Sequence, residues 1–325
     1  MNDNMLEIRN LCVSFPTDKG EVKAAADVSL TVPKGKIAGI VGESGCGKSV
    51  TARSVMGLIR RPGRVTAGEI LLDGREILHL PEKEKCRLRG SEMSMIFQEP
   101  MTSLNPVVRV GKQVEETVLL HEQLSGTAAR KRVLEMLEAV GIADPQKRYN
   151  AWPHQLSGGL RQRVMIAMAM ICRPKLLIAD EPTTALDVTV EAQILQLMRR
   201  LCEGGTSVLL ISHNLGVIAQ VCDWVSVMYA GRVVESADTD TLFDRPMHPY
   251  TRGLMRAVSS LQENGEHLDT IPGTVPDLNH LPEGCSFSPR CSLCADGCRQ
   301  RMPELEEIMP GHTVRCFRPG EEAEA

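Results

Sequence analysis

Eight consecutive residues of this chain have the types and spacing that bind the phosphates of a nucleotide. They fit the pattern G-x-x-x-x-G-K-[ST], between an apolar run at 36–41 and a helical pattern at 50–59. Glycines let backbone N–H groups turn inward around an anion, and the helix start adds partial positive charge. We expect Lys48 to reach the β- and γ-phosphates and the Ser49 hydroxyl to hold Mg²⁺. The residues of this phosphate loop are Gly42, Glu43, Ser44, Gly45, Cys46, Gly47, Lys48 and Ser49.

Two carboxylates, Asp180 and Glu181, follow an apolar run that is typical of a buried parallel strand. Asp180 can bind Mg²⁺ through water, and Glu181 is placed to polarise a water that attacks the γ-phosphate. A solvated acidic turn is the alternative for such a pair standing alone, but this pair follows a phosphate loop. His213 follows the next apolar run, 207–211, at its C-terminal end and is predicted to contact the γ-phosphate.

Two further residues are candidates for the same chemistry. Gln98 follows the strand pattern at 93–97 and can complete the Mg²⁺ coordination and position the attacking water. Phe15 ends the first strand of an alternating pattern over 5–34 and is predicted to stack on adenine. The alternative for Phe15 is a core or turn residue.

A second anion-binding helix start lies at 156–163, where Ser157 is a good N-cap and Gly158 and Gly159 expose backbone N–H groups. Within one subunit this start has no ligand, because the phosphate loop already holds the phosphates. It makes sense if it closes over a nucleotide bound by a different subunit.

The remaining pattern supplies the elements that position these residues. Residues 5–34 predict an antiparallel strand pair, about 106–155 predict helices inserted between two halves of an α/β core, and 225–235 predict a hairpin. The net charge of −4 gives no global electrostatic case for nucleic-acid binding. No apolar run reaches the 18 or so residues of a membrane span, and the polar N-terminus lacks a signal-peptide core, so we expect a cytoplasmic protein.

Six motifs, taken in order along the chain, resemble those of the ATP-binding subunit of an ABC transporter. They are the phosphate loop, Gln98, the 156–160 segment, Asp180-Glu181, 185–187 and His213. The resemblance covers residues 5–236. It implies an α/β fold of the P-loop NTPase class: a RecA-like core with an antiparallel β-subdomain and a helical insert at about 99–172.

The same resemblance implies an ATPase that works as a head-to-tail dimer with two ATP molecules at the joint. Each ATP would be held by the 42–49 loop of one subunit and by Ser157, Gly158 and Gly159 of the other. Asp187 joins this set of ATP-binding residues by the resemblance.

Three segments narrow the resemblance to dipeptide and oligopeptide importers: 98–106, 245–251 and 272–276. The family then implies a C-terminal extension over 237–325 and pairing with a paralogous ATPase, or with an identical copy. It also implies two membrane-spanning partners at the cytoplasmic face of the membrane and an external peptide-binding protein. Residues 98–106 are candidates for the membrane-subunit contact; the alternative is a simple linker between lobes.

Five of the eleven cysteines fall in the last 41 residues. A disulfide set is disfavoured where cytosolic thiols stay reduced, and zinc would be irregular because only Cys291 and Cys294 have C-x2-C spacing. The resemblance implies a 4Fe-4S cluster on four cysteines spaced C-x5-C-x6-C-x17-C, with Cys294 as a departure; binding no metal is the other alternative. The four candidate ligands are Cys285, Cys291, Cys298 and Cys316.

Three other functions compete with peptide import. A nickel or other small-solute importer shares much of this pattern. A nucleic-acid or ribosome-associated ABC ATPase would favour paired ATPase domains, a long coiled-coil insertion or a basic patch, and the sequence has none of these. The third alternative is a regulatory ABC subunit without catalytic activity, and the presence of Glu181 and His213 argues against it.

Overall fold

The computed structural model describes residues 3–18, 20–99, 103–184, 186–262 and 271–321. The chain divides into two compact units. One contains 79–211 with the short segments 1–5 and 33–37, and the other contains 6–32, 38–78 and 212–325. Each unit is built from segments that are distant in the sequence.

An antiparallel sheet forms one part of the second unit, and it confirms the strands expected at 5–34. Its order is β2-β1-β4-β5, and β1 pairs with β4 so that Leu6 lies opposite Leu72. Alternate side chains of β1, including Leu6 and Ile8, are buried, as the alternating pattern predicts. The strands are β1 (Asn4–Thr17), β2 (Gly20–Pro33), β4 (Arg64–Leu72) and β5 (Arg75–Glu76).

The other strands of this unit pair around β9. β3 is parallel to β9, and the β9–β10 pair is antiparallel, which confirms the predicted hairpin. β12 then pairs with β10, and β11 pairs with β12. The strands are β3 (Ile37–Val41), β9 (Trp224–Tyr229), β10 (Arg232–Asp238), β11 (Glu306–Met309) and β12 (His312–Val314).

The sequence pattern did not predict β11 and β12, which extend the sheet from within the cysteine-rich tail. It also placed the end of the first helix too late: α1 ends at Val55, and Gly57 then adopts a positive φ of 64°. The helices of this unit are α1 (Lys48–Val55), α9 (Leu215–Val221), α10 (Thr239–Asp244), α11 (Pro249–Gln262), the 3-10 turn η2 (Ser288–Arg290) and α12 (Asp296–Gln300).

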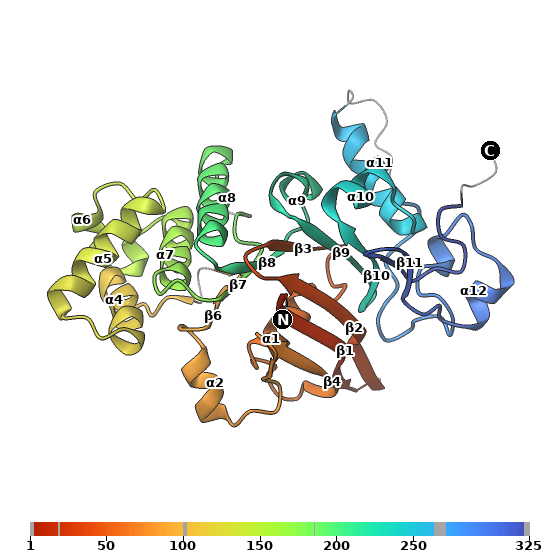
Figure 1. Cartoon of the computed structure of the whole chain (residues 1–325), viewed down its shortest axis with the longest axis horizontal. Helices are drawn as coiled ribbons and strands as arrows, with labels where there is room; N and C mark the ends of the chain where they lie inside the picture. The colour runs from red at the N-terminus through yellow and green to blue at the C-terminus, as the bar shows by residue number, and fades with distance from the viewer. Residues whose placement is uncertain (1–2, 19, 100–102, 185, 263–270, 322–325) are drawn as a thin grey trace. The chain divides into compact units, whose positions relative to one another are not determined.

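The first unit combines parallel strands with the helices expected around 106–155. β7 pairs in parallel with both β6 and β8, and every residue of the three strands is buried. Figure 1 shows α4, α5, α6 and α7 gathered into one helical group. The strands are β6 (Met93–Ile96), β7 (Leu176–Asp180) and β8 (Ser207–Ile211). The helices are α2 (Glu82–Leu88), α4 (Val110–His121), α5 (Gly126–Ala139), α6 (Pro145–Tyr149), the 3-10 turn η1 (Pro153–Gln155), α7 (Gly158–Met170) and α8 (Val188–Glu203).

A buried carboxylate joins three segments of the second unit. Glu235 of β10 is fully buried. Its Oε1 accepts from the backbone N–H of Met247 at 2.7 Å and lies 2.8 Å from Nε2 of His312, and its Oε2 accepts from the N–H of His248 at 2.9 Å. A buried charge is tolerated when its hydrogen bonds are complete. Glu235 therefore fixes the segment before α11 and the strand β12 against β10.

Replacing Glu235 by glutamine should lower the free energy of unfolding by about 1–3 kcal/mol, because the new amide N–H group cannot accept from the backbone donors. Denaturant unfolding of the full chain measures this. Glu306→Gln is the matched control, since Glu306 shares Val314 as its register partner but is exposed. Equal losses in the two variants would contradict the role given to Glu235.

Candidate functional site

The phosphate loop connects β3 to α1, as the sequence predicts, and its shape requires glycine. Gly42 and Gly47 have φ of 150° and 103°. A Cβ atom on Gly42 would clash with the carbonyl oxygen of Met228, and one on Gly47 would clash with that of Ala24. These two glycines therefore let the loop pass directly against backbone of β9 and β2.

Lys48 is folded across this loop. Its side chain is nearly buried, and Nζ donates to the carbonyl oxygens of Gly42 at 2.6 Å and of Glu43 at 3.0 Å. Burial also raises the pKa of the neighbouring Cys46 thiol. The only cation of the loop therefore lies among the carbonyl groups at its opening turn.

The same unit contains three other residues predicted for the site. Ser49 is the second residue of α1 and is half-buried; His213 follows β8 and is exposed. Phe15 of β1 is half-buried, and its ring lies against Gly63, where a Cβ atom would clash with it. The proposed stacking of Phe15 on adenine stays a prediction.

In the other unit the structure brings Gln98 and Glu181 together. β6 and β7 are parallel, with Ile96 opposite Ala179, so the residues just beyond each strand lie at one edge. Nε2 of Gln98 donates to Oε2 of Glu181 at 3.0 Å. Asp180, the last residue of β7, is fully buried.

Two features of Glu181 were not expected from the sequence. Its φ of 48° lies in the left-handed region, which costs a non-glycine residue about 1–3 kcal/mol and is commonest at functional sites. Its Oε2 also accepts from Oγ1 of Thr184 at 3.3 Å. A threonine three residues after a carboxylate was the only sequence signal for this contact.

The second helix start has the predicted geometry. Oγ of Ser157 accepts from the N–H of Leu160 at 3.4 Å, and a Cβ atom on Gly158 would meet nothing within 4 Å. Ser157 and Gly158 are exposed, whereas Gly159 is half-buried. This short glycine-bearing start of α7 is thus open to a ligand or a partner.

Asp187 lies in the same unit as α7. Its Oδ1 accepts from the N–H of Val190 at 3.0 Å and so caps α8, and its Oδ2 lies 3.8 Å from Nη2 of Arg163 on α7. Ala185 of the predicted 185–187 motif and residues 100–102 of the predicted contact segment lie outside the described residues.

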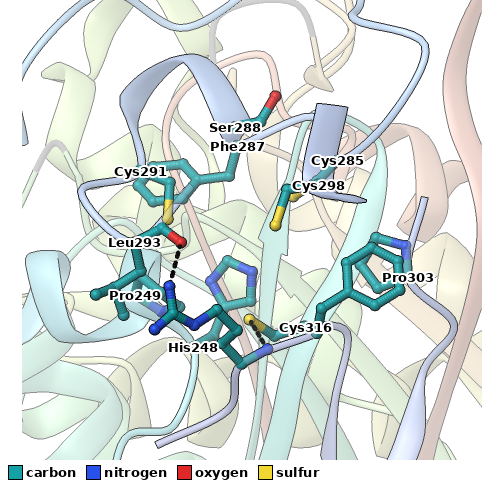
Figure 2. Close-up of a pocket in the computed structure, with 12 residues that line it drawn as sticks. His248, Pro249, Cys285, Phe287, Ser288, Cys291, Leu293, Cys298, Pro303 and Cys316 are labelled. Carbon is teal, nitrogen blue, oxygen red and sulfur yellow. Dashed lines mark hydrogen bonds between the residues drawn. The ribbon is translucent and has the colours of Figure 1, made fainter. Parts of the chain in front are cut away.

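The four cysteines predicted as ligands line one pocket of the second unit (Figure 2). Cys294 is not among the lining residues, and its thiol donates to the carbonyl of Ala295 at 3.7 Å. All eleven cysteines are free thiols. Other residues that line the pocket include His248, Pro249, Phe287, Leu293, Pro303 and Phe317.

Three thiols of this pocket have raised pKa values. Burial raises the pKa of Cys285 and of Cys291 to about 11, and it also raises the pKa of Cys316. Among the residues that the structure describes, no group of three or more His, Cys, Asp or Glu is arranged to hold a metal ion.

Within the described ranges, no helix has both the length and the apolar character of a membrane span.

Two family models match the chain. A model described as ABC transporter matches residues 25–184, and a model of the oligopeptide/dipeptide transporter C-terminal region matches residues 234–298. The oligopeptide transport ATP-binding protein OppD of Salmonella typhimurium is 50% identical over 98% of this chain and 95% of its own length. The dipeptide transport ATP-binding protein DppD of Bacillus subtilis is 48% identical over 99% and 97%.

The fold is also similar to that of solved structures. The dimeric structure of MJ0796, a bacterial ABC transporter cassette, is 28% identical with a TM-score of 0.67, covering 72% of this chain and 99% of that one. A second dimeric structure of MJ0796, described as a post-hydrolysis state bound to ADP and Pi, matches equally well. These matches show the ABC ATPase fold.

Proposed function

The chain belongs to the ABC transporter family as an ATP-binding subunit, and from that premise we propose that it hydrolyses ATP to drive the import of oligopeptides or dipeptides. The observation that carries the proposal is similarity to peptide-transport ATP-binding proteins over nearly the whole chain, including the tail. We assign the chain two domains: a catalytic domain over 5–236, with a helical insert at about 99–172, and a C-terminal extension over 237–325.

ATP would bind at the phosphate loop with its phosphates against the backbone N–H groups. Lys48 would exchange the carbonyl oxygens of Gly42 and Glu43 for the β- and γ-phosphates, since a cation gains more from anionic oxygens than from neutral ones. Phe15 would stack on the adenine. The loop's fixed glycine turns support this, because a preformed nest needs no reordering on binding.

The metal candidates fit Mg²⁺ by the chemistry of their donors. Ser49, Asp180 and Gln98 offer hydroxyl, carboxylate and amide oxygens, and Mg²⁺ prefers oxygen ligands. Gln98 uses its amide nitrogen to bond Glu181, which leaves the amide oxygen as its ligand atom. Bound Mg²⁺ would neutralise charge on the phosphates.

Glu181 would act as the general base that polarises the attacking water. Gln98 and Thr184 hold one of its carboxylate oxygens, so the direction of the other oxygen is restricted. His213 would contact the γ-phosphate. The left-handed backbone at Glu181 supports a functional role, because strain of this kind persists where surrounding structure enforces it.

A partner subunit would complete the site. Ser157, Gly158 and Gly159 would contact the ATP held by the partner's phosphate loop, and Asp187, beside α7, would complete the ATP-binding set. The open space around Gly158 supports this role. ATP would stabilise the closed dimer over the open one, and its hydrolysis would release that closure.

The partner ATPase would be a paralogue, or a second copy of this chain. Two membrane-spanning subunits would bind through the segment around 98–106, whose residues 100–102 are undescribed, and an external peptide-binding protein would deliver the cargo. The chain would thus work at the cytoplasmic face of the cell membrane.

The cysteine pocket is proposed to hold a 4Fe-4S cluster, with zinc as the less favoured occupant. Support comes from the donor set: Cys285, Cys291, Cys298 and Cys316 line one pocket, whereas Cys294 does not. Such a cluster would supply a cross-link between the segments that carry its ligands. Because burial favours the protonated thiols, loading must release protons and should weaken as the pH falls.

Replacing Glu181 by glutamine should lower ATP turnover of the assembled transporter on the order of 10²–10⁴-fold, because the amide cannot accept a proton. ATP binding should remain, since the side chain keeps its shape. Turnover is measured with and without a peptide-loaded binding protein, and Glu203→Gln, an exposed carboxylate at the end of α8, serves as control. Unchanged turnover would show that Glu181 is not the base.

Gly158→Glu should abolish ATP turnover in the assembled transporter while leaving ATP affinity of the isolated chain unchanged. The added carboxylate would repel the phosphates bound by the partner, and a Cβ atom at this position meets nothing within 4 Å. Gly126→Glu is the control, because Gly126 also follows an N-cap serine and has equally open surroundings. Loss of ATP binding by the isolated Gly158→Glu chain would contradict the partner role.

Anaerobically purified full-length chain should contain iron and acid-labile sulfide, and Cys298→Ser should reduce both because a ligand is removed. Cys294→Ser should leave the metal content unchanged, since that thiol lies outside the pocket lining. Iron, zinc and sulfide analysis and the visible absorption spectrum measure this. Protein with neither iron nor zinc would remove the metal proposal.

A further inference from the structure

We infer that Arg290, from the C-terminal extension, is a positioning residue for ATP: it holds Glu43 and thereby fixes the opening turn of the phosphate loop. This inference rests on the proposed ATP-binding function and deepens it, since it makes the extension part of the nucleotide site. Both residues belong to the same compact unit although 247 positions separate them.

Arg290 uses all five of its N–H donors at this place. Nη1 and Nη2 donate to the two carboxylate oxygens of Glu43, at 2.7 and 3.1 Å. Nη1 also donates to the hydroxyl of Tyr229 at 3.4 Å, Nη2 to the carbonyl of Ile271 at 3.3 Å, and Nε to the carbonyl of Pro272 at 2.9 Å. A guanidinium with every donor engaged has one orientation.

Burial makes this pair sensitive to its geometry. The side chain of Arg290 is only 4% exposed and that of Glu43 is 26% exposed. The hydrogen bonds to Glu43 raise the pKa of Arg290, so the guanidinium stays charged. Paired charges with parallel N–H···O bonds need the planar fork of arginine, which lysine lacks.

The main chain of Glu43 is held from both sides as well. Its N–H donates to the hydroxyl of Tyr250 in α11 at 3.0 Å. Its carbonyl accepts from Nζ of Lys48 at 3.0 Å and from the N–H of Cys46 at 3.3 Å. This N–H therefore points to the extension, and the phosphates must be bound by donors later in the loop.

The position of Glu43 consequently determines where the Lys48 ammonium group lies before ATP binds. Lys48 bonds the carbonyls of residues 42 and 43, and the extension holds residue 43 through Arg290 and Tyr250. Without Arg290, the carboxylate of Glu43 would lose its partner beside the lysine that should reach the phosphates. A free carboxylate there would compete for Lys48 and repel ATP.

The test measures the Kd for Mg-ATP of the full-length chain, the KM and kcat of the assembled transporter, and the unfolding temperature. Arg290→Met should raise both Kd and KM by about tenfold, the size expected for a coupled pair, with kcat much less affected. Arg290→Lys should recover only part of this loss. In Arg290→Met/Glu43→Gln the loss should be smaller than in Arg290→Met, because no unpaired carboxylate remains.

Arg315→Lys is the control for simple destabilisation of the extension. Arg315 is also nearly buried, donating to Asp27 at 3.0 Å and to the carbonyl of Val233 at 3.0 Å. Its variant should unfold at lower temperature with unchanged Kd and KM. If Arg290→Met does not fold, Glu43→Gln alone still tests the contact, and it should weaken ATP binding through loss of the ion pair.

The inference would be overturned by Arg290 and Glu43 variants that bind ATP like the wild type, or by an Arg315→Lys chain that loses affinity as much as Arg290→Met. A double variant that loses affinity as the full product of the single losses would overturn it too. A wild-type chain that neither binds nor hydrolyses ATP would instead fail the proposed function itself, and the inference with it.

Discussion

The close approach of two glycines to backbone carbonyl groups is the constraint on which the nucleotide site depends. Gly42 touches β9 and Gly47 touches β2, and no side chain fits at either contact. Both have the positive φ that other residues avoid. The shape of the phosphate loop is therefore determined by the backbone of β9 and β2 that packs against it.

The Glu181 carboxylate depends on a second constraint, the parallel register of β6 and β7. Because the strands end side by side, Gln98 and Glu181 can share a hydrogen bond although they are far apart in the sequence. The fully buried strands hold this edge, while Glu181 itself adopts a strained conformation beyond it. The buried strands β6 and β7 thus orient the Glu181 carboxylate, which the segment after β7 could not orient by itself.

The sequence predicted these elements where a pattern was local. The G-x-x-x-x-G-K-[ST] spacing located the phosphate loop. The apolar runs located β7, which ends at Asp180, and β8, which His213 follows. It could not predict contacts made by distant residues. Nothing near Arg290 indicates Glu43, and β11 and β12 are too short to give a period-2 pattern.

Some assignments depend on more than either pattern or geometry. Ser125-Gly126 and Ser157-Gly158 both begin helices behind an N-cap serine. The second was distinguished by the additional Gly159 and by the order of motifs along the chain. Four of the five tail cysteines line a common pocket, and they are the four that the resemblance implies as ligands. In both cases the useful information came from several segments of the chain considered together, not from one short pattern.

The hydrogen bonds of Glu235 have a consequence for how such chains can diverge. One carboxylate serves the segment before α11 and a histidine near the C-terminus, so the tail is not an appendage that recombination could exchange freely. A chimera that brings in a foreign tail must bring a compatible partner for that carboxylate or leave a buried charge uncompensated.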